Sequence, residues 1–504
     1  MKTNRRTLTF AALTATVAVT TLTGAATPPA HAGDSLPALD WKPCARADGP
    51  AAQECAELPV PLDYRAPDGP SISLAVTRVR SDRPSARRGT LLVIPGGPGS
   101  SGVQRVTQKG EELLRETGGR YDIVGLDPRG VGGSPKASCE LAPEDRDLVN
   151  LRSWPAADGS ITGNVERSRR TAEACARNGG AMLRGLTTAN EVRDIDRFRQ
   201  ALGEEKLSAW GTSYGTYVGA VYAQKYPGRT DRWVLDSNDD PDPSRGARGW
   251  LANMAVGTED RFPDFARWAA DPAREAEGLR LAERAEDVRP WVLALAARLD
   301  REPKESTTPG VPLTGNRLRQ ALQNALYDDD FFAPLATLLR AAADASAKPV
   351  LPAALAQPLP DPDAAVTIAV ICNDVRWPAA DPAYRRAVAR AVAEDRAEHP
   401  LSAGMPRNIT PCSFWKDAPA DRPARITDEG PSNILMIQNL RDPATPYSAA
   451  MKMRRAFGDR ARMVAVDHGG HGVYLGNGNA CGDRAVTTFL TTGVRPERDT
   501  LCPN

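Results

Sequence analysis

The stretch "LSAWGTSYGTYVGAVYAQKYP", Leu207 to Pro227, contains a G-x-S-x-G pattern centred on Ser213. An apolar run ends at this serine and a helix-compatible run begins directly after it, which predicts a strand, a sharp turn and a helix. Gly211 and Gly215 are the small residues that such a turn needs on either side of a nucleophile. The turn would lift the Ser213 hydroxyl above a sheet and point the helix N-terminus at it. The pattern therefore indicates a nucleophilic serine rather than a serine in a glycine-rich loop.

Short apolar runs of the kind that buried parallel strands make lie on both sides of this turn. They are Ser71–Val79, Thr90–Ile94, Tyr121–Asp127, Leu207–Ser213, Trp233–Ser237, Ser432–Leu440 and Ala461–Asp467. Helical patterns alternate with them, most clearly at 188–203, where we expect Thr188 and Glu191 to form a capping box. This alternation predicts an α/β fold, a mostly parallel sheet with helices on both faces.

The pattern changes between residues 241 and 429, where helical segments and proline-rich loops replace the strands. We therefore expect residues 33–240 to form the first part of the core and 241–429 to form an inserted helical lid. Residues 430–504, in which strands return, would complete the core. The 504 residues suit a large core with an insertion of this size.

Charge and composition exclude several classes of function. The 64 basic and 63 acidic side chains give a formal net charge of +1, without a long run of one sign. We therefore expect no nucleic-acid partner and no attachment to a membrane surface, and we expect a monomer.

The N-terminus has the pattern of an export signal. Lys2, Arg5 and Arg6 precede an apolar stretch, and "AHA" at 30–32 supplies a cleavage site. Residues 1–32 are therefore expected to be a signal peptide cleaved near Ala32, and the mature protein is expected to be secreted. The sequence does not choose between the general and the twin-arginine export routes.

Eight cysteines follow this signal, an even number that predicts disulfides in an exported chain. They are Cys44, Cys55, Cys139, Cys175, Cys372, Cys412, Cys481 and Cys502. They form four sequence-local couples, so pairing of neighbours is the simplest arrangement. No C-x-x-C motif occurs to suggest zinc or redox chemistry, and we expect no metal and no other cofactor.

A nucleophilic serine needs a base, and the base needs an orienting carboxylate. His468 and His471 both lie in "VDHGGHGVY", a glycine-rich loop after the last strand, whereas His399 ends a lid helix and is expected to be a surface residue. Gly470 and Gly472 flank His471 and favour it, with His468 as the alternative. The chain order serine, acid, histidine places the acid after the preceding strand, at Asp442 in "ILMIQNLRDPATP".

Backbone N–H groups are needed to hold the developing oxyanion. One is expected from Tyr214, directly after the nucleophile. The other is expected from "LLVIPGGPGSSG", where Gly96, Gly97 and Gly99 allow the backbone to approach a substrate oxygen. This loop matches neither phosphate-binding pattern, G-x-x-x-x-G-K-[ST] or G-x-G-x-x-G, so nucleotide binding is not expected.

These motifs, together with "YDIVGLDPRGVGGS" and "AVICND", resemble those of secreted tripeptidyl aminopeptidases of actinobacteria. These are α/β-hydrolases related to prolyl aminopeptidases, and the resemblance covers the whole mature chain. It implies Ser213 as nucleophile, Asp442 as acid and His471 as base, with Gly97 and Tyr214 as oxyanion donors. It also favours neighbour-paired disulfides. Ser237 departs from the pattern, which has glycine there.

The resemblance implies a serine exopeptidase that removes tripeptides from peptides with a free N-terminus. Such an enzyme must bind the terminal ammonium through carboxylates, for which Asp374, Asp239 and Asp240 are the candidates. The ordinary alternative for each is a helix cap or a turn. The alternatives for the whole chain are an esterase or amidase of the same fold, or a catalytically silent binding protein.

Overall fold

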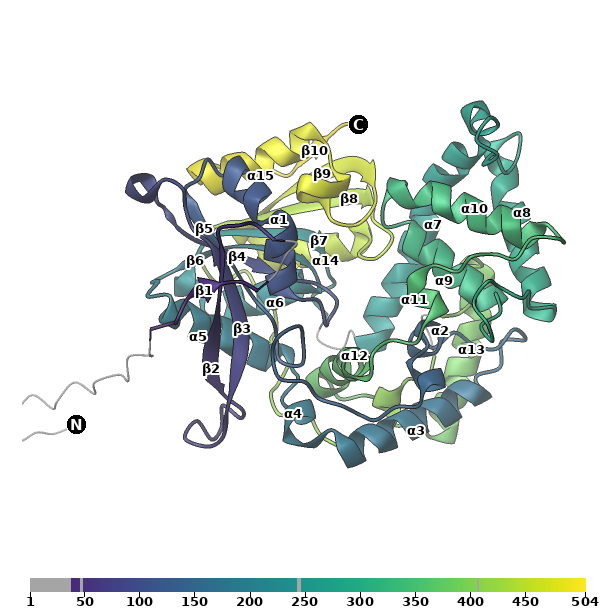
Figure 1. Ribbon diagram of the computed structural model, residues 1–504, viewed down its shortest axis with the longest axis horizontal. Helices are drawn as coiled ribbons and strands as arrows, with labels where there is room; N and C mark the ends of the chain where they lie inside the picture. The colour runs from purple at the N-terminus through teal and green to yellow at the C-terminus, as the bar shows by residue number, and fades with distance from the viewer. Residues whose placement is uncertain (1–37, 46–48, 243–245, 406–407) are drawn as a thin grey trace, which may run out of the picture. The chain divides into compact units, whose positions relative to one another are not determined.

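The computed structural model describes residues 38–45, 49–242, 246–405 and 408–504, so the expected signal peptide lies outside the described residues. The framework is a ten-stranded sheet in the order β1-β2-β3-β5-β4-β6-β7-β8-β9-β10 (Figure 1). The strands are β1 (Lys42–Pro43), β2 (Gln53–Pro61), β3 (Ser71–Val79), β4 (Gly89–Ile94), β5 (Tyr121–Leu126), β6 (Leu207–Ser213), β7 (Thr230–Asn238), β8 (Ile434–Arg441), β9 (Ala461–Gly469) and β10 (Thr500–Cys502). Pairing is antiparallel from β1 to β5 and parallel from β5 to β10, which confirms the expected α/β fold with a mostly parallel sheet.

Helices bury both faces of the sheet, which is why its central strands are continuously apolar. Leu91 and Val93 of β4 face one apolar core, and Leu92 and Ile94 face the other. The first core is closed by α1 (Gly102–Glu116) and α15 (Ala480–Thr492). The second is closed by α5 (Thr188–Ala201), α6 (Tyr214–Lys225) and α14 (Tyr447–Phe457).

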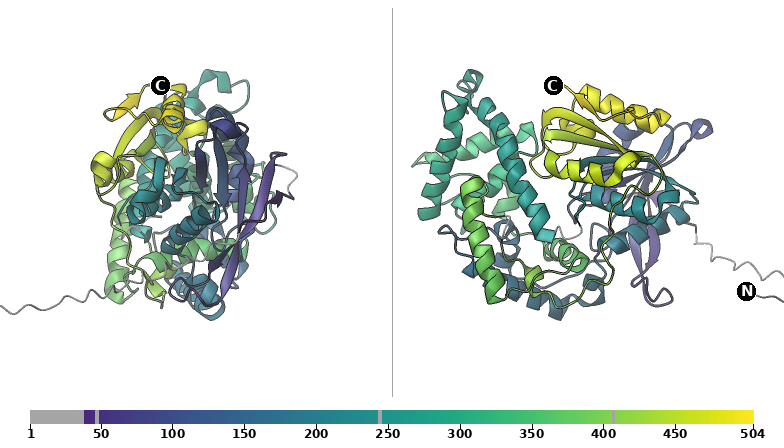
Figure 2. Two further views of the ribbon diagram at one scale, coloured as in Figure 1. Left: turned by 90° about the vertical axis from the view of Figure 1, so that its left-hand side faces the viewer. Right: turned by 180° about the vertical axis from the view of Figure 1, so that it is seen from behind.

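Between β7 and β8 the chain is helical, as Figure 2 shows from two further directions. The helices are α7 (Gly246–Ala270), α8 (Ala285–Arg301), α9 (Gly315–Ala325), α10 (Phe332–Ala343), α11 (Ala353–Ala356), α12 (Asp361–Asp374) and α13 (Pro382–Glu398). Helices α7 to α10 share a separate apolar core that includes Phe265 and Phe332. No helix in the part of the chain that the structure describes is long and apolar enough to cross a membrane.

Two helices, α12 and α2, pack against a core other than the one that their place in the sequence suggests. Helix α12 packs Ala365 and Ile368 into the core of the sheet. In the opposite direction α2 (Leu148–Leu151), which precedes β6, packs Leu148 and Val149 against the separate helical core. The helices α3 (Thr162–Asn178) and α4 (Gly180–Arg184) follow α2 in the chain. Each of the two cores thus contains residues from a part of the chain that the sequence pattern assigns to the other.

Four disulfides link cysteines that are neighbours in the sequence. They are Cys44–Cys55, Cys139–Cys175, Cys372–Cys412 and Cys481–Cys502, and no cysteine of the described residues is free. Disulfides persist in oxidising compartments, so their number indicates a protein that works outside the cytoplasm.

The predicted capping box of α5 is wrong by one residue. Thr187 is the N-cap, and its side chain accepts a hydrogen bond from the Asn190 N–H. Thr188 instead donates its N–H and its hydroxyl to the carboxylate of Asp374. Glu191 is buried beside the Tyr214 hydroxyl. Thr188 and Glu191 therefore contact residues that are distant in the sequence instead of forming the cap, and the local pattern does not show such contacts.

A close approach at Gly102 fixes the loop that precedes α1. A Cβ atom on Gly102 would lie 2.1 Å from the carbonyl oxygen of Leu126. We predict that Gly102→Ala lowers the free energy of unfolding, measured by denaturant titration, by about 1–3 kcal/mol, since backbone must move to admit the methyl group.

Gly163→Ala, in the first turn of α3, is the matched control because nothing lies within 4 Å of the position that its methyl group would take. It should be neutral or stabilising by up to about 1 kcal/mol, from helix propensity. Equal effects of the two substitutions would contradict this account of the α1–β5 contact.

Candidate active site

Ser213 stands at the junction of β6 and α6, in a backbone conformation that few residues other than glycine adopt. Its φ is 61° and its ψ is −130°. Non-glycine residues held at positive φ cost free energy and persist only where the surroundings fix them. This is the sharp strand-to-helix turn that the sequence predicts, and it places the Ser213 side chain at the N-terminal end of α6.

Glycines make this turn sterically possible. A Cβ on Gly215 would lie 2.4 Å from the Ile94 carbonyl oxygen, and one on Gly211 would lie 2.6 Å from the Gly215 carbonyl oxygen. A Cβ on Gly96 would lie 2.8 Å from the Cβ of Ser213. The end of β4 and the serine turn therefore touch through their backbones, and any side chain at these positions would separate them.

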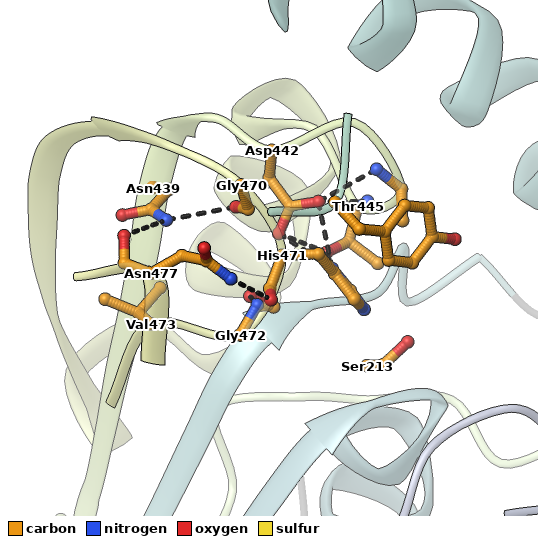
Figure 3. Close-up of polar contacts among 12 residues, drawn as sticks. Ser213, Asn439, Asp442, Thr445, Gly470, His471, Gly472, Val473 and Asn477 are labelled. Atoms are coloured by element: carbon orange, nitrogen blue, oxygen red, sulfur yellow. Dashed lines mark hydrogen bonds and ion pairs between the residues drawn. The ribbon is translucent and has the colours of Figure 1, made fainter. Parts of the chain in front are cut away.

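Asp442 and His471 form a hydrogen-bonded pair beside this serine. Nδ1 of His471 lies 3.0 Å from each carboxylate oxygen of Asp442. The Asp442 side chain is fully buried and also accepts the N–H groups of Ala444 and Thr445 at 2.8 and 2.9 Å. Figure 3 shows the His471 ring between the Asp442 carboxylate and the Ser213 hydroxyl. The three side chains come from the carboxyl ends of β6 and β8 and from the loop after β9.

Two opposing effects set the pKa of His471. Burial is the largest single effect and lowers it, but the charge and hydrogen bond of Asp442, together with the charges of Asp236 and Asp239, outweigh burial and raise the pKa of His471 above its usual value. The pair thus favours the imidazolium that forms when a histidine accepts a proton.

The loop that carries His471 is held at its backbone by β7. The Gly472 N–H donates to the hydroxyl of Ser237 at 2.8 Å, and the N–H groups of Val473 and Tyr474 donate to the buried carboxylate of Asp236 at 2.8 and 2.9 Å. Ser237 itself has a φ of 59°. These contacts were not predicted from the sequence, although the departure from glycine at Ser237 marked the position.

Asparagines and the helical segment complete the support of this loop. Asn439 donates to the Gly470 carbonyl and Asn477 donates to the His471 carbonyl, at 3.0 and 2.8 Å (Figure 3). The His471 N–H donates to the carbonyl of Tyr327, whose ring meets the imidazole edge-on with centroids 5.0 Å apart. The histidine is therefore oriented from the sheet and from the helices together.

The other histidines have different surroundings. Nδ1 of His468 lies 2.7 Å from the carbonyl oxygen of Gly469, and Nδ1 of His399 lies 3.0 Å from Asp395 in the helical segment. Among the histidines of the described residues, His471 alone contacts Asp442.

Ser213 and His471 line one cavity of about 500 Å³. Gly97 lines it too, and it also lines a smaller neighbouring cavity of about 30 Å³ with Tyr214. The two expected oxyanion donors therefore lie where the two cavities meet the serine turn. Within the described residues no cluster of His, Cys, Asp or Glu is arranged to hold a metal ion.

The three carboxylates considered for ammonium binding have different surroundings in the structure. Asp374 and Asp239 line the small cavity together. Asp240 instead accepts a hydrogen bond from Lys452 at 2.6 Å and lies outside that lining. Asp374 also binds the N–H of Thr188 at 2.8 Å, so part of its role is to hold the start of α5.

A chain of hydroxyls connects Asp374 to the residue after the nucleophile. The Tyr214 hydroxyl lies 2.6 Å from the hydroxyl of Thr188, which donates to Asp374. It also lies 3.5 Å from Glu191, and burial, with the nearby carboxylates of Asp194 and Asp374, raises the pKa of Glu191 to about 8. These contacts hold the side chain of Tyr214 in the lining of the small cavity.

Several known proteins are similar in sequence to this chain along most of its length. A family model described as "TAP-like protein" matches residues 399–502. The tripeptidyl aminopeptidase of Streptomyces lividans is 34% identical over 483 residues, which cover 92% of this chain and 86% of that protein. The serine protease Hip1 of Mycobacterium tuberculosis is 28% identical and covers 92% of this chain and 91% of its own. Carboxylesterase B of Mycobacterium tuberculosis is 29% identical, with 89% and 86% covered.

The raised pKa of His471 gives a test of the Asp442 contact that needs no substrate. We predict that Asp442→Asn moves the pKa of His471 below 6.5, because the raising charge is removed while the burial remains. Histidine ring resonances followed by NMR against pH measure this directly, since the chain has four histidines.

His399 serves as the internal reference in the same spectra, because its partner is Asp395 rather than Asp442. Its ring resonances should be the same in both proteins. A His471 pKa that is unchanged or higher in Asp442→Asn would show that the pair does not control this imidazole.

Proposed function

Because this chain belongs to the tripeptidyl aminopeptidase family of α/β-hydrolases, we propose that Ser213, Asp442 and His471 are the catalytic triad of a serine exopeptidase. The enzyme would release tripeptides from the free N-termini of peptides. The observation that carries the proposal is the His471–Asp442 pair beside a serine held at positive φ, with Ser213 and His471 open to one cavity.

In the first step the Ser213 hydroxyl attacks the scissile carbonyl while the free ring nitrogen of His471 accepts its proton. Asp442 keeps the Nδ1–H directed at itself and stabilises the imidazolium. The imidazolium then protonates the leaving amine, which departs and leaves an acyl-enzyme. Water hydrolyses that ester with His471 again as base.

The oxyanion would be held by the N–H groups of Gly97 and Tyr214. Both residues stand on elements whose backbone positions are fixed by the glycine contacts around Ser213. The N-terminus of α6 adds its dipole at the same point. Donors fixed in place before the reaction stabilise the developing charge without having to reorganise.

The terminal ammonium of the substrate would bind at the small cavity, where Asp374 and Asp239 supply the opposite charge. Its volume of about 30 Å³ is enough for a group the size of a water molecule or an ammonium. An ammonium held at a fixed distance from Ser213 would limit how many residues lie before the scissile bond. This limit on the number of residues before the scissile bond distinguishes an exopeptidase from other hydrolases of the same fold.

The enzyme would act outside the cell, as a monomer exported by the signal peptide of residues 1–32. The four disulfides and the family relatives support an extracytoplasmic location. Peptides are its proposed substrates, and the proposed reaction uses only side chains, backbone N–H groups and water.

An esterase is the second candidate, favoured by the similarity to a carboxylesterase. The two functions differ in their dependence on the substrate N-terminus. An esterase should accept acetylated substrates, whereas an exopeptidase should lose most of its kcat/KM on them.

We predict that the wild-type enzyme cleaves a chromogenic tripeptide anilide far better than its N-acetylated form, and that Asp374→Asn reduces this preference. The loss of one partner of a desolvated ion pair costs about 2–5 kcal/mol, so the ratio of free to blocked kcat/KM should fall at least about 30-fold.

Asp361→Asn is the matched control, because Asp361 caps backbone N–H groups of residues 139–141 at the other end of the same helix. It should leave the free-to-blocked ratio as it is. If Asp374→Asn lowers kcat/KM equally for the free and the acetylated substrate, Asp374 has a structural role. Asp239 then becomes the candidate for binding the terminal ammonium. Wild-type enzyme with no preference for the free N-terminus would favour the esterase.

A further inference from the structure

Two arginines line the cavity that holds Ser213 and His471. Arg105 comes from α1, and Arg152 directly follows α2. Each guanidinium lies over an indole ring, Arg105 at 5.4 Å from the centroid of Trp210 and Arg152 at 4.7 Å from that of Trp250. Stacking of this kind fixes the plane of a guanidinium and leaves its N–H edge available.

Neither arginine has an ion-pair partner within the described ranges of the chain. The side chain of Arg152 makes a long contact, 3.9 Å, to the sulfur of Met254. Burial lowers the pKa of both guanidinium groups, opposed by the carboxylate of Asp236 for Arg105 and by the phenol of Tyr327 for Arg152. Two partly desolvated cations thus share a cavity without a directly paired carboxylate, and this costs free energy that a bound anion would offset.

The described lining of this cavity contains no aspartate or glutamate. Its other polar side chains are those of Ser100, Ser101, Gln104, Gln108, Thr212, Tyr327 and Thr445, together with the serine and histidine of the site. The smaller neighbouring cavity has the opposite character, with Asp374 and Asp239 and no lysine or arginine in its described lining. Gly97 and Trp250 line both cavities, so the charge changes sign across the serine turn.

The position of His471 indicates which end of a bound peptide lies in the arginine-lined cavity and which lies in the acidic one. In the proposed reaction the imidazolium protonates the leaving amine, so the leaving segment must lie on the side of His471. His471 lines the arginine cavity and is absent from the lining of the acidic one. The N-terminal side of a peptide therefore faces the carboxylates, and its C-terminal side faces the arginines.

Resting on the proposed function, we infer that Arg105 and Arg152 bind a carboxylate on the leaving segment of the peptide. The carboxylate is either the C-terminus of a short substrate or an acidic side chain close after the scissile bond. Guanidinium groups match carboxylates in a bidentate geometry, and this favours them over lysine at such a site. The enzyme is thereby specific for short or acidic leaving segments as well as for the free N-terminus.

The test compares three tetrapeptides that differ in one charge: Ala-Ala-Ala-Ala with a free C-terminus, the same peptide as its amide, and Ala-Ala-Ala-Asp amide. Wild-type enzyme should cleave the free acid with a kcat/KM at least about tenfold above that of the amide. Arg152→Gln and Arg105→Gln should move this ratio toward one, and Arg152→Lys should retain part of it. Cleavage of the aspartyl amide at the rate of the acid assigns the site to any nearby carboxylate. Cleavage at the rate of the plain amide assigns it to the C-terminus.

Arg115→Gln is the matched control, because Arg115 lies on the same helix, α1, with its side chain 67% exposed and outside the cavity lining.

A second readout is independent of turnover: calorimetric binding of the tetrapeptide acid and amide to Ser213→Ala. The acid should bind at least about tenfold more tightly, and Arg152→Gln on that background should remove the difference. Equal binding of acid and amide, or a preference that survives both glutamine substitutions, would overturn the inference. If the wild-type enzyme cleaves none of the tetrapeptides but Ser213→Ala still binds the acid more tightly than the amide, only the proposed function is contradicted.

Discussion

The structure depends on a backbone contact between the end of β4 and the turn at Ser213. Gly215 meets the carbonyl oxygens of Ile94 and Pro95, and Gly96 meets Ser213 itself, at distances that no Cβ could occupy. This contact holds the serine at positive φ and brings the Gly97 loop to its side. Any residue larger than glycine would move Ser213 and the Gly97 loop apart, because the segments that touch here continue directly from β4 and β6, two paired strands of one sheet.

The remaining parts of the site reach this turn because parallel strands end at one edge of the sheet. Strands β7, β8 and β9 each contribute at that edge: Asp236 and Ser237 hold a loop, Asp442 supplies the carboxylate and His471 the imidazole. The helical segment closes the arrangement through Tyr327. In the proposed function, the sheet fixes the reacting groups, and Arg105, Arg152 and Trp250 line the cavity through which a substrate would approach them.

The sequence predicted what depends on local pattern. Strands β3 to β9 and the turn at Ser213 follow from apolar runs and from glycines at fixed spacing, and their ends lie within a few residues of the expected ones. Strands β1, β2 and β10, at the two ends of the sheet order, were not predicted. Contacts between distant segments were missed. Thr188 binds Asp374 instead of capping its helix, and α12 packs into the sheet core despite its place in the helical region. Arg105 and Arg152 come from α1 and from the end of α2, and only the fold brings them to one cavity, because no motif joins them.

Covalent labelling tests the central claim most directly. A fluorophosphonate, which reacts with activated serines, should form a single adduct that maps by mass spectrometry to the peptide containing Ser213. Labelling should slow by orders of magnitude in His471→Ala and remain close to wild type in His468→Ala, because His471 is the histidine that contacts Asp442. An adduct on another serine, such as Ser237, or a rate that depends on His468 rather than His471, would contradict the account.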